Sequence, residues 1–325
     1  MTKSISHVTP RVAYRAAAKQ RGAVLMLLAA AFFWGSGNIA NKSVLTDLDP
    51  FAAAALRNLV AALALAPFAW REISKISGGQ RWLRSAVPPS LLFAIAIILQ
   101  QWGYQDATVT NASFLVNAAS VVTPIIAFFV LKERLHSCIA IAAALTILGV
   151  FLMSGAGKSL STMNAGDLAC LAAALFYAGW MVALGQHATR HNSPAATTCL
   201  HCLMAMIFAG IGLLIFTPHQ PGSFEGAVPE ILYLGVFSSA VAFGLTAAAQ
   251  AHVSASATAV LVSAESLFGA AGAIVVLGER PGTIVFFGAG LMLIAIVIVA
   301  RLPVAMRTPI RTGPQFISIR KGNSS

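Results

Sequence analysis

Glu265 is a carboxylate near the middle of an apolar stretch, residues 258–281, that is long enough to cross a bilayer. About 20 apolar residues at about 1.5 Å per residue span a hydrocarbon core of about 30 Å. A charged side chain at that depth costs at least about 2.5–3.5 kcal/mol, so an acid inside the membrane indicates function by default. Glu265 is therefore predicted to bind a proton or a solute in a central cavity. The alternative is a structural acid that stays neutral or paired.

Arg57 is a cation inside another apolar stretch, about seven residues and roughly 10 Å from the nearer end of that stretch. Its guanidinium could hold the carboxylate of a solute or pair with Glu265. Alternatively, it reaches the polar headgroups or bonds backbone carbonyls, which are structural roles. The sequence leaves a structural and an anion-binding role open for Arg57.

Uncharged polar and aromatic side chains on the apolar stretches are further candidates for solute contact. Polar side chains on spanning helices face protein or a wet cavity rather than lipid. The predicted substrate-binding side chains are Trp34, Asn38, Gln101, Asn117, Tyr177, Trp180, Gln250 and Glu265, with Glu265 also coupling protons. The sequence has no evident Ser/His/Asp set, paired carboxylates or metal-ligand pattern, so we expect no catalytic residue, no metal and no cofactor, and a protein that is not an enzyme.

The composition is typical of a polytopic helical membrane protein. Of the 325 residues, 58% are hydrophobic and 10% are charged, whereas about 25% of the residues in soluble domains are charged. The net charge of +11 does not indicate nucleic-acid binding, because the basic residues flank the apolar segments. The predicted transmembrane helices are residues 22–42, 51–70, 87–105, 109–131, 137–155, 167–187, 197–216, 230–250, 254–277 and 281–301.

Lysines and arginines are concentrated on one side of this predicted membrane. With a cytoplasmic N-terminus, 17 of the 21 lie in cytoplasmic loops and tails, three lie outside, and Arg57 lies within the membrane. Seven of the ten acidic residues fall in the outer loops. This bias predicts a multi-pass protein of the cell (inner) membrane with both termini cytoplasmic.

The chain repeats at a constant offset of 146 residues. Residues 112–135 align with 258–281, and Trp34 aligns with Trp180. Glu265 breaks the repeat, because Ala119 is its counterpart. The acid is therefore present in one copy only.

Each half of the repeat contains five predicted helices, and because five is odd the second half must cross the membrane inverted. The sequence thus predicts an all-α integral membrane fold with ten transmembrane helices, arranged as two inverted-topology five-helix repeats. The repeats are residues 22–155 and 167–301, and the basic cytoplasmic tails are residues 1–21 and 302–325. In such folds the substrate site lies near the midplane, between the halves.

Short motifs occur in a characteristic order along residues 22–301. They are Trp34-Gly35-Ser36 with Asn38, Leu56-Arg57-Asn58, Asn111-Ala112-Ser113-Phe114-Leu115 with Thr123-Pro124, Ser263-Ala264-Glu265, and Leu277-Gly278-Glu279-Arg280. In their order and spacing the chain resembles the drug/metabolite transporter superfamily, in particular its EamA-type ten-helix members. One position departs from the resemblance, because Ser266 follows Glu265 where the family often has proline. We therefore expect the helix over 254–277 to be straighter, or to bend at Gly269 or Gly272.

The resemblance implies proton-linked or exchange transport of small metabolites, often export, without a nucleotide or prosthetic group. We therefore expect a secondary active transporter that moves a small metabolite or drug-like solute, amino-acid-like compounds included, by alternating access. Membrane lipid and a second copy in a homodimer are the expected partners besides the solute, and nucleic acid is not. The alternative is a non-transporting membrane scaffold or assembly protein of the same fold. The resemblance also favours a structural role for Arg57, since members with different substrates have an arginine there.

Overall fold

The computed structural model describes residues 10–107, 109–133, 136–154, 163–216, 226–278, 280 and 282–302. Within these ranges the regular secondary structure is helical and contains no extended strand. The helices are α1 (Pro10–Asp47), α2 (Pro50–Ile73), α3 (Gly79–Asp106), α4 (Val109–Asn117), α5 (Ala119–Leu131), α6 (Ser137–Ser154), α7 (Ala165–Arg190), α8 (Pro194–Phe216), α9 (Val228–Tyr233), the π-helical η2 (Leu234–Val241), α10 (Ala242–Gln250), α11 (Ala255–Val262), α12 (Glu265–Leu277) and α13 (Thr283–Arg301).

The described helices have the lengths and composition of membrane spans. Nine helical segments are long and apolar enough to cross a bilayer, and Ser137–Met153 is a tenth, shorter apolar helix. Large apolar side chains face outward, among them Phe129 and Phe287, which are 73% and 71% exposed. Such exposure is unfavourable in water and favourable in lipid. The predicted all-helical membrane fold is confirmed at this level.

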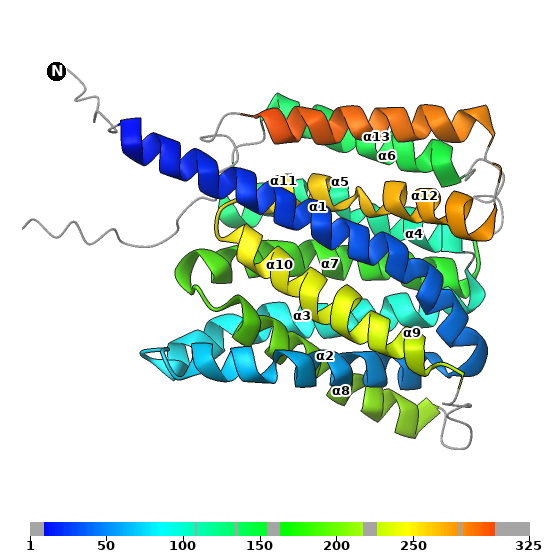
Figure 1. Ribbon diagram of the computed structural model, residues 1–325, viewed down its shortest axis with the longest axis horizontal. Helices are drawn as coiled ribbons and strands as arrows, with labels where there is room; N and C mark the ends of the chain where they lie inside the picture. The colour runs from blue at the N-terminus through cyan, green and yellow to red at the C-terminus, as the bar shows by residue number, and fades with distance from the viewer. Residues whose placement is uncertain are drawn as a thin grey trace, which may run out of the picture.

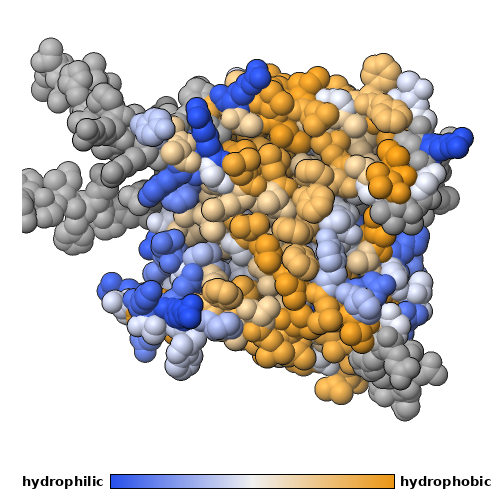
Figure 2. Space-filling view, in the orientation of Figure 1, coloured by the Kyte–Doolittle hydropathy of each residue, from blue (hydrophilic) through white to orange (hydrophobic). Residues whose placement is uncertain are grey.

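The helices run back and forth along the long axis of the molecule, so their ends gather at two opposite faces (Figure 1). One face, the basic end, contains Lys19, Arg21, Arg71, Lys75, Arg81, Arg84, Lys132, Arg190 and Arg301. The opposite face, the acidic end, contains Asp47, Asp49, Asp106, Asp167 and Glu230. Figure 2 shows a broad apolar band between hydrophilic residues at the two ends. The band has the form expected of a surface in contact with lipid.

Several helix boundaries differ from the sequence predictions. Helix α1 begins at Pro10, whereas the sequence predicts that the first helix begins at residue 22, after a basic tail. Proline is favoured in the first turn of a helix, and the alanines at 16–18 are strong helix formers, so the helix extends beyond the apolar segment. Helix α3 likewise begins at Gly79 instead of residue 87.

The predicted helices 109–131 and 254–277 are each broken into two. Helix α4 ends at Asn117 and α5 begins at Ala119, while α11 ends at Val262 and α12 begins at Glu265. The first residues of α5 and α12 are 146 positions apart, and their last residues are also 146 positions apart, which is the offset of the sequence repeat. Both helices terminate at a residue with left-handed backbone geometry, Lys132 at φ 54° and Gly278 at φ 66°. The two halves of the chain therefore bend at matching positions.

The break before Glu265 corrects the prediction that this helix is straight or bends at Gly269 or Gly272. It occurs without proline, at Ser263 and Ala264. The Ser263 hydroxyl donates to the carbonyl oxygen of Val260 at 2.6 Å. A side chain that occupies a backbone acceptor in this way competes with the helical ladder. The hydroxyl of Ser263 thus takes up one backbone acceptor at this break, where proline is missing.

Helix packing brings the two halves of the chain together. Helix α2 packs on α8, α6 on α13, α3 on α7, and α1 on α10 and α12. At the α6–α13 crossing the backbones touch, because a Cβ atom at Gly149 would lie 2.6 Å from the carbonyl oxygen of Gly288. Small residues permit such close approach between helices in a membrane. The shared core contains residues from α1, α3, α4, α7, α10 and α11, and it surrounds the cavity described next.

Candidate functional site

A cavity of about 80 Å³ lies inside the bundle. Its walls come from α1, α2, α3, α7, η2, α10 and the two broken helices. One buried water needs about 10–15 Å³ on this measure, so the cavity has room for several waters or one small solute. The elements around it come from both halves of the chain.

Most of the side chains that the sequence singled out face this one cavity. The predicted residues among its lining are Trp34, Asn38, Arg57, Asn117, Tyr177, Trp180 and Glu265. Gln101 and Gln250 are not part of the lining. Helix α2 contributes to the wall through Arg57, for which the sequence left a structural and an anion-binding role open.

Glu265 lies at the first position of α12, directly after the break, and is partly exposed to the cavity. Its carboxyl group hydrogen-bonds with Asn117, the last residue of α4. The Asn117 amide also donates to the hydroxyl of Ser266 at 2.9 Å. The break in one half of the chain is thus bonded to the break in the other. A carboxyl group held at a helix start and open to a cavity can exchange a proton with a solute or with water.

Gly35 of α1 positions the first turn of α12. A Cβ atom at residue 35 would lie 2.4 Å from the carbonyl oxygen of Glu265 and 2.7 Å from the backbone nitrogen of Gly269. Real Cβ atoms do not approach backbone this closely, so only glycine fits here without movement. The contact fixes the distance between α1 and the residue with the acidic group.

Aromatic side chains close the cavity on the side toward the basic end. Trp34 packs on Phe243 with ring centroids 4.8 Å apart, and Trp180 packs on Phe243 at 5.5 Å. Phe93, which is fully buried, contacts Phe243 at 4.6 Å. We call Trp34, Trp180, Phe243 and Phe93 the aromatic layer.

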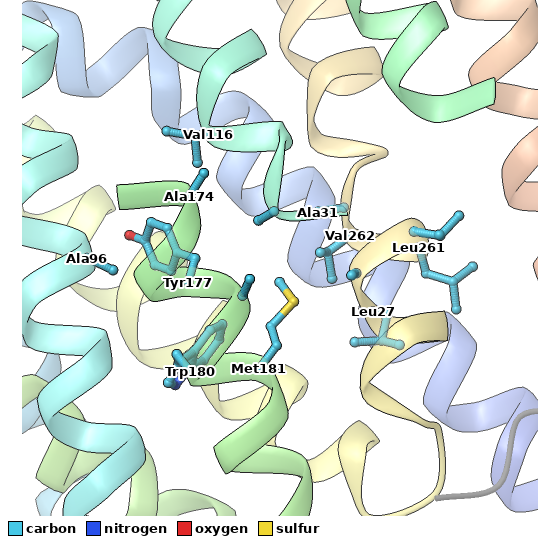
Figure 3. Packing of buried hydrophobic residues seen from close by; sticks show 14 of the residues in the cluster. Leu27, Ala31, Ala96, Val116, Ala174, Tyr177, Trp180, Met181, Leu261 and Val262 are labelled. Carbon is cyan, nitrogen blue, oxygen red and sulfur yellow. The ribbon is translucent and has the colours of Figure 1, made fainter. Parts of the chain in front are cut away.

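Apolar residues continue this packing toward the basic end. Figure 3 shows Trp180 and Met181 of α7, with Leu261 and Val262 of α11, in one cluster of buried apolar residues. Leu27 of α1 is fully buried in the same cluster. The cavity is therefore separated from the basic end by packed side chains.

A polar strip lines the cavity between α1, α3 and α7. The Tyr177 hydroxyl donates to Gln100 at 2.6 Å, and the Gln100 amide donates to the Tyr104 hydroxyl at 3.2 Å. Tyr104 in turn donates to Asn38 at 3.4 Å. The sequence prediction missed Gln100 and Tyr104. Their spacing of four residues places them on one face of a helix, and that signal could have identified them.

Gln101 and Gln250 are buried elsewhere. The Gln101 amide donates to the side chain of Asn41 at 3.0 Å, while Asn41 itself lines the cavity. Gln250 is fully buried, and in the described part of the chain neither atom of its amide has a hydrogen-bond partner. Gln101 therefore supports the wall from behind, and Gln250 lies beyond it.

Arg57 extends from α2 to the π-helical segment η2. Its Nε donates to the hydroxyl of Ser239 at 3.1 Å, and its Nη2 donates to the hydroxyl of Ser238 at 3.3 Å. The Trp34 indole donates to the carbonyl oxygen of Ser238 at 2.9 Å. These bonds join α1, α2 and η2 around one edge of the cavity. π-Helical turns occur often at functional sites, but the sequence did not predict this one.

A second buried acid, Glu133, lies outside the spans, in the connection after α5 at the basic end. It is 6% exposed and accepts a hydrogen bond from the Ser256 hydroxyl at 2.6 Å. Burial raises the pKa of Glu133 above its ordinary value of 4.5, and the bonds from Ser256 and the backbone of Ala255 oppose that rise. Glu133 therefore ties the end of α5 to the start of α11. Its sequence counterpart in the repeat, Glu279, lies outside the described residues.

A solved crystal structure has the same fold. It superposes with a TM-score of 0.71 at 18% sequence identity, over 87% of this chain and 98% of that chain. At this identity the likeness concerns the fold alone.

Curated relatives are named as transporters. An uncharacterized transporter of Archaeoglobus fulgidus is 27% identical over 282 residues, which cover 87% of each chain. The uncharacterized transporter YwfM of Bacillus subtilis is 24% identical over 87% of this chain and 95% of its own. A chloroplastic WAT1-related protein of Arabidopsis thaliana is 26% identical over 68% of this chain and 55% of its own.

The family model that matches this chain is the EamA-like transporter family, and it matches twice, at residues 21–155 and at residues 164–301. The two matches cover nearly all of the helical bundle. The predicted resemblance is thereby confirmed, and the chain belongs to the EamA-like transporter family.

Proposed function

We propose that the protein is a secondary active transporter that moves a small metabolite or drug-like solute through the central cavity by alternating access. The observation that carries this proposal is the position of Glu265, an acid at a helix break that faces a cavity with aromatic and amide walls. Discontinuous helices with functional groups at the break are a recurring form of transporter binding site. Amino-acid-like solutes are among the candidates, because the cavity combines an acid, a cation and aromatic surface.

Two inverted five-helix halves, residues 22–155 and 167–301, form the proposed moving parts. The matching helix breaks support this arrangement, as do the two separate family matches. In inverted repeats, access alternates when one half rocks against the other around a fixed site. The cavity lies on the acidic side of the aromatic layer, which then acts as the closed gate of this conformation.

We further propose that the basic end faces the cytoplasm of the cell and that both termini lie there. Lysine and arginine are concentrated at this end, as the positive-inside rule requires. The cavity would then lie on the outer side of the aromatic layer, and the proposed direction of net transport is export, as the family resemblance implies.

Protonation of Glu265 is the proposed coupling step. A carboxyl group in a low-dielectric cavity is stabilised in its neutral form unless a cation or hydrogen bonds compensate. Binding or loss of a proton there changes the charge of the site and can bias which side is open. Solute and proton would compete for the same carboxyl group.

The test begins with thermal unfolding of the purified protein across amino acids, nucleosides and cationic drugs, since a specific ligand must raise stability. A stabilising compound is then used in proteoliposomes that contain either the wild type or Glu265→Gln. We expect the variant to lose the pH dependence of transport and most of its rate. Undiminished transport with unchanged pH dependence would rule out coupling through Glu265. A protein that neither binds nor exchanges any compound would instead be a scaffold of the same fold.

A further inference from the structure

Arg57 is a buried cation for which the described residues supply no counter-charge. Its side chain is 7% exposed, and its hydrogen-bond partners are the hydroxyls of Ser238 and Ser239. The tyrosines that line the same cavity, Tyr104 and Tyr177, are uncharged at neutral pH. A buried charge is normally paired, because the loss of its hydration is otherwise uncompensated.

Glu265 does not compensate Arg57 by direct contact, although both line the cavity. The carboxyl group of Glu265 is bonded to Asn117 on the broken helices, whereas Arg57 is bonded to η2. The acid and the cation therefore form two separate polar sites within one cavity.

The guanidinium is held in place and still has donors to offer. Arginine has five N–H groups, and the two serine hydroxyls occupy one on Nε and one on Nη2. The remaining groups belong to a side chain that lines the cavity. Two N–H groups in a fixed plane match the geometry of a carboxylate, and they also attract a spherical anion.

The wall behind Arg57 is built closely enough to keep this geometry. A Cβ atom at Gly235 would lie 2.5 Å from the side chain of Val60 and 3.0 Å from the carbonyl oxygen of Arg57. The absence of a side chain at Gly235 thus lets η2 approach α2 and brings both serines to the guanidinium. The Trp34 indole fixes Ser238 from the other side through its carbonyl oxygen.

We infer that Arg57 and Ser238, with Ser239 holding the guanidinium in place, form an anion subsite in the cavity wall, which takes a small monoanionic group. The group is either the carboxylate of the transported solute or a chloride ion. The first source rests on the proposed function, since it requires the cavity to be the transport site. Binding itself can be tested without transport, so the two proposals can fail separately.

The experiment measures thermal unfolding of the full-length protein in detergent at constant ionic strength. The probes are acetate, its uncharged analogue acetamide, and chloride, with sulfate as the background anion. We expect a saturable rise in Tm with acetate, with chloride or with both, and no rise with acetamide. A rise with acetate alone assigns the subsite to a solute carboxylate, and a rise with chloride alone assigns it to the inorganic ion.

Variants locate the effect. Arg57→Gln should abolish the rise, and Arg57→Lys, which keeps the charge but loses the planar fork, should weaken apparent affinity at least about tenfold. Arg280→Gln removes an exposed arginine at the acidic end and should leave the rise unchanged. If Arg57→Gln does not fold, the inference is still tested by Arg57→Lys and by the comparison of Tm shifts with acetate and acetamide on the wild type. The inference is overturned if neither anion raises the Tm of the wild type, or if acetamide raises it as much as acetate does. It is also overturned if either Arg57 variant shows the same rise at the same anion concentrations as the wild type. Solute transport that persists in such a case would leave the proposed function standing.

Discussion

Replacement of Gly35 by alanine tests how α1 positions the acidic group of the site. A Cβ atom at residue 35 would lie 2.4 Å from the carbonyl oxygen of Glu265, 2.7 Å from the backbone nitrogen of Gly269 and 2.8 Å from Cβ of Phe268. Ordinary contact begins at 3.4 Å, so α1 and α12 must separate by about 1 Å. The obstructing atoms are backbone and Cβ atoms, which cannot rotate away. Overpacking of this kind costs about 1–3 kcal/mol.

The assay is thermal unfolding of the purified variant in detergent, together with transport of a stabilising solute in proteoliposomes. At about 2 °C per kcal/mol for a chain of this size, Tm should fall by about 2–6 °C. Transport should fall as well, because the separation moves the first turn of α12 and Glu265 with it. Gly244→Ala in α10 is the matched control, since no atom lies within 4 Å of the added Cβ. Alanine is about 0.5–1 kcal/mol better than glycine inside a helix, so this control should be neutral or more stable.

Two outcomes would refute this reasoning about Gly35. A Gly35→Ala protein with the Tm and transport rate of the wild type would mean that α1 and α12 do not meet through backbone contact. An equal loss in Gly244→Ala would mean that the bundle tolerates no alanine at glycine positions, whatever the local space.

Two further predictions concern packing and pH. Gly288→Ala should lower Tm, because its Cβ atom would lie 2.4 Å from the carbonyl oxygen of Gly149. The control is Gly290→Ala on the same helix, which meets no atom within 4 Å and should not lower Tm. Equal shifts in Tm for the two variants would contradict the α6–α13 contact. The raised pKa of Glu133 means that the folded protein holds this proton more tightly than the unfolded chain, so the contribution of Glu133 to stability should be largest below about pH 4.5 and should be lost as pH rises through the raised pKa. Glu133→Gln should remove that part of a Tm–pH profile, and a profile identical to that of the wild type would show that Glu133 does not titrate in this way.

The membrane spans and their order could be predicted from sequence because bilayer thickness fixes the length of each apolar segment. The acid and most polar candidates were also visible, since such side chains are conspicuous among apolar neighbours. Gln100 and Gln101 show where this reasoning stops. Adjacent helical residues point about 100° apart, and composition does not say which of the two faces the cavity. The structure places Gln100 in the wall and Gln101 behind it.

The helix break before Glu265 and the partners of Arg57 could not be predicted for a different reason. Proline is a strong signal for a break, whereas the hydroxyl bond from Ser263 to Val260 depends on a rotamer and has a counterpart inside the unbroken α3, from Ser90 to Ala86. The two serines that hold Arg57 are 181 and 182 residues away in the chain, and both lie in the π-helical segment. Long-range contacts of this kind follow from packing between elements, which local sequence does not determine.

The π-helical segment η2 also bears on how the chain can tolerate insertion and deletion. Each π-type hydrogen bond spans one residue more than an α-type bond, so η2 accommodates more chain per turn than the helices on either side. The neighbours Ser238 and Ser239, which both bond Arg57, lie within this segment, and Phe243 of the aromatic layer follows it directly. Loss of one residue from 234–241 would allow an ordinary α-helix, which has no place for the extra residue that the π-type turns accommodate. In this segment the number of residues, and not only their identity, determines which side chains reach the cavity.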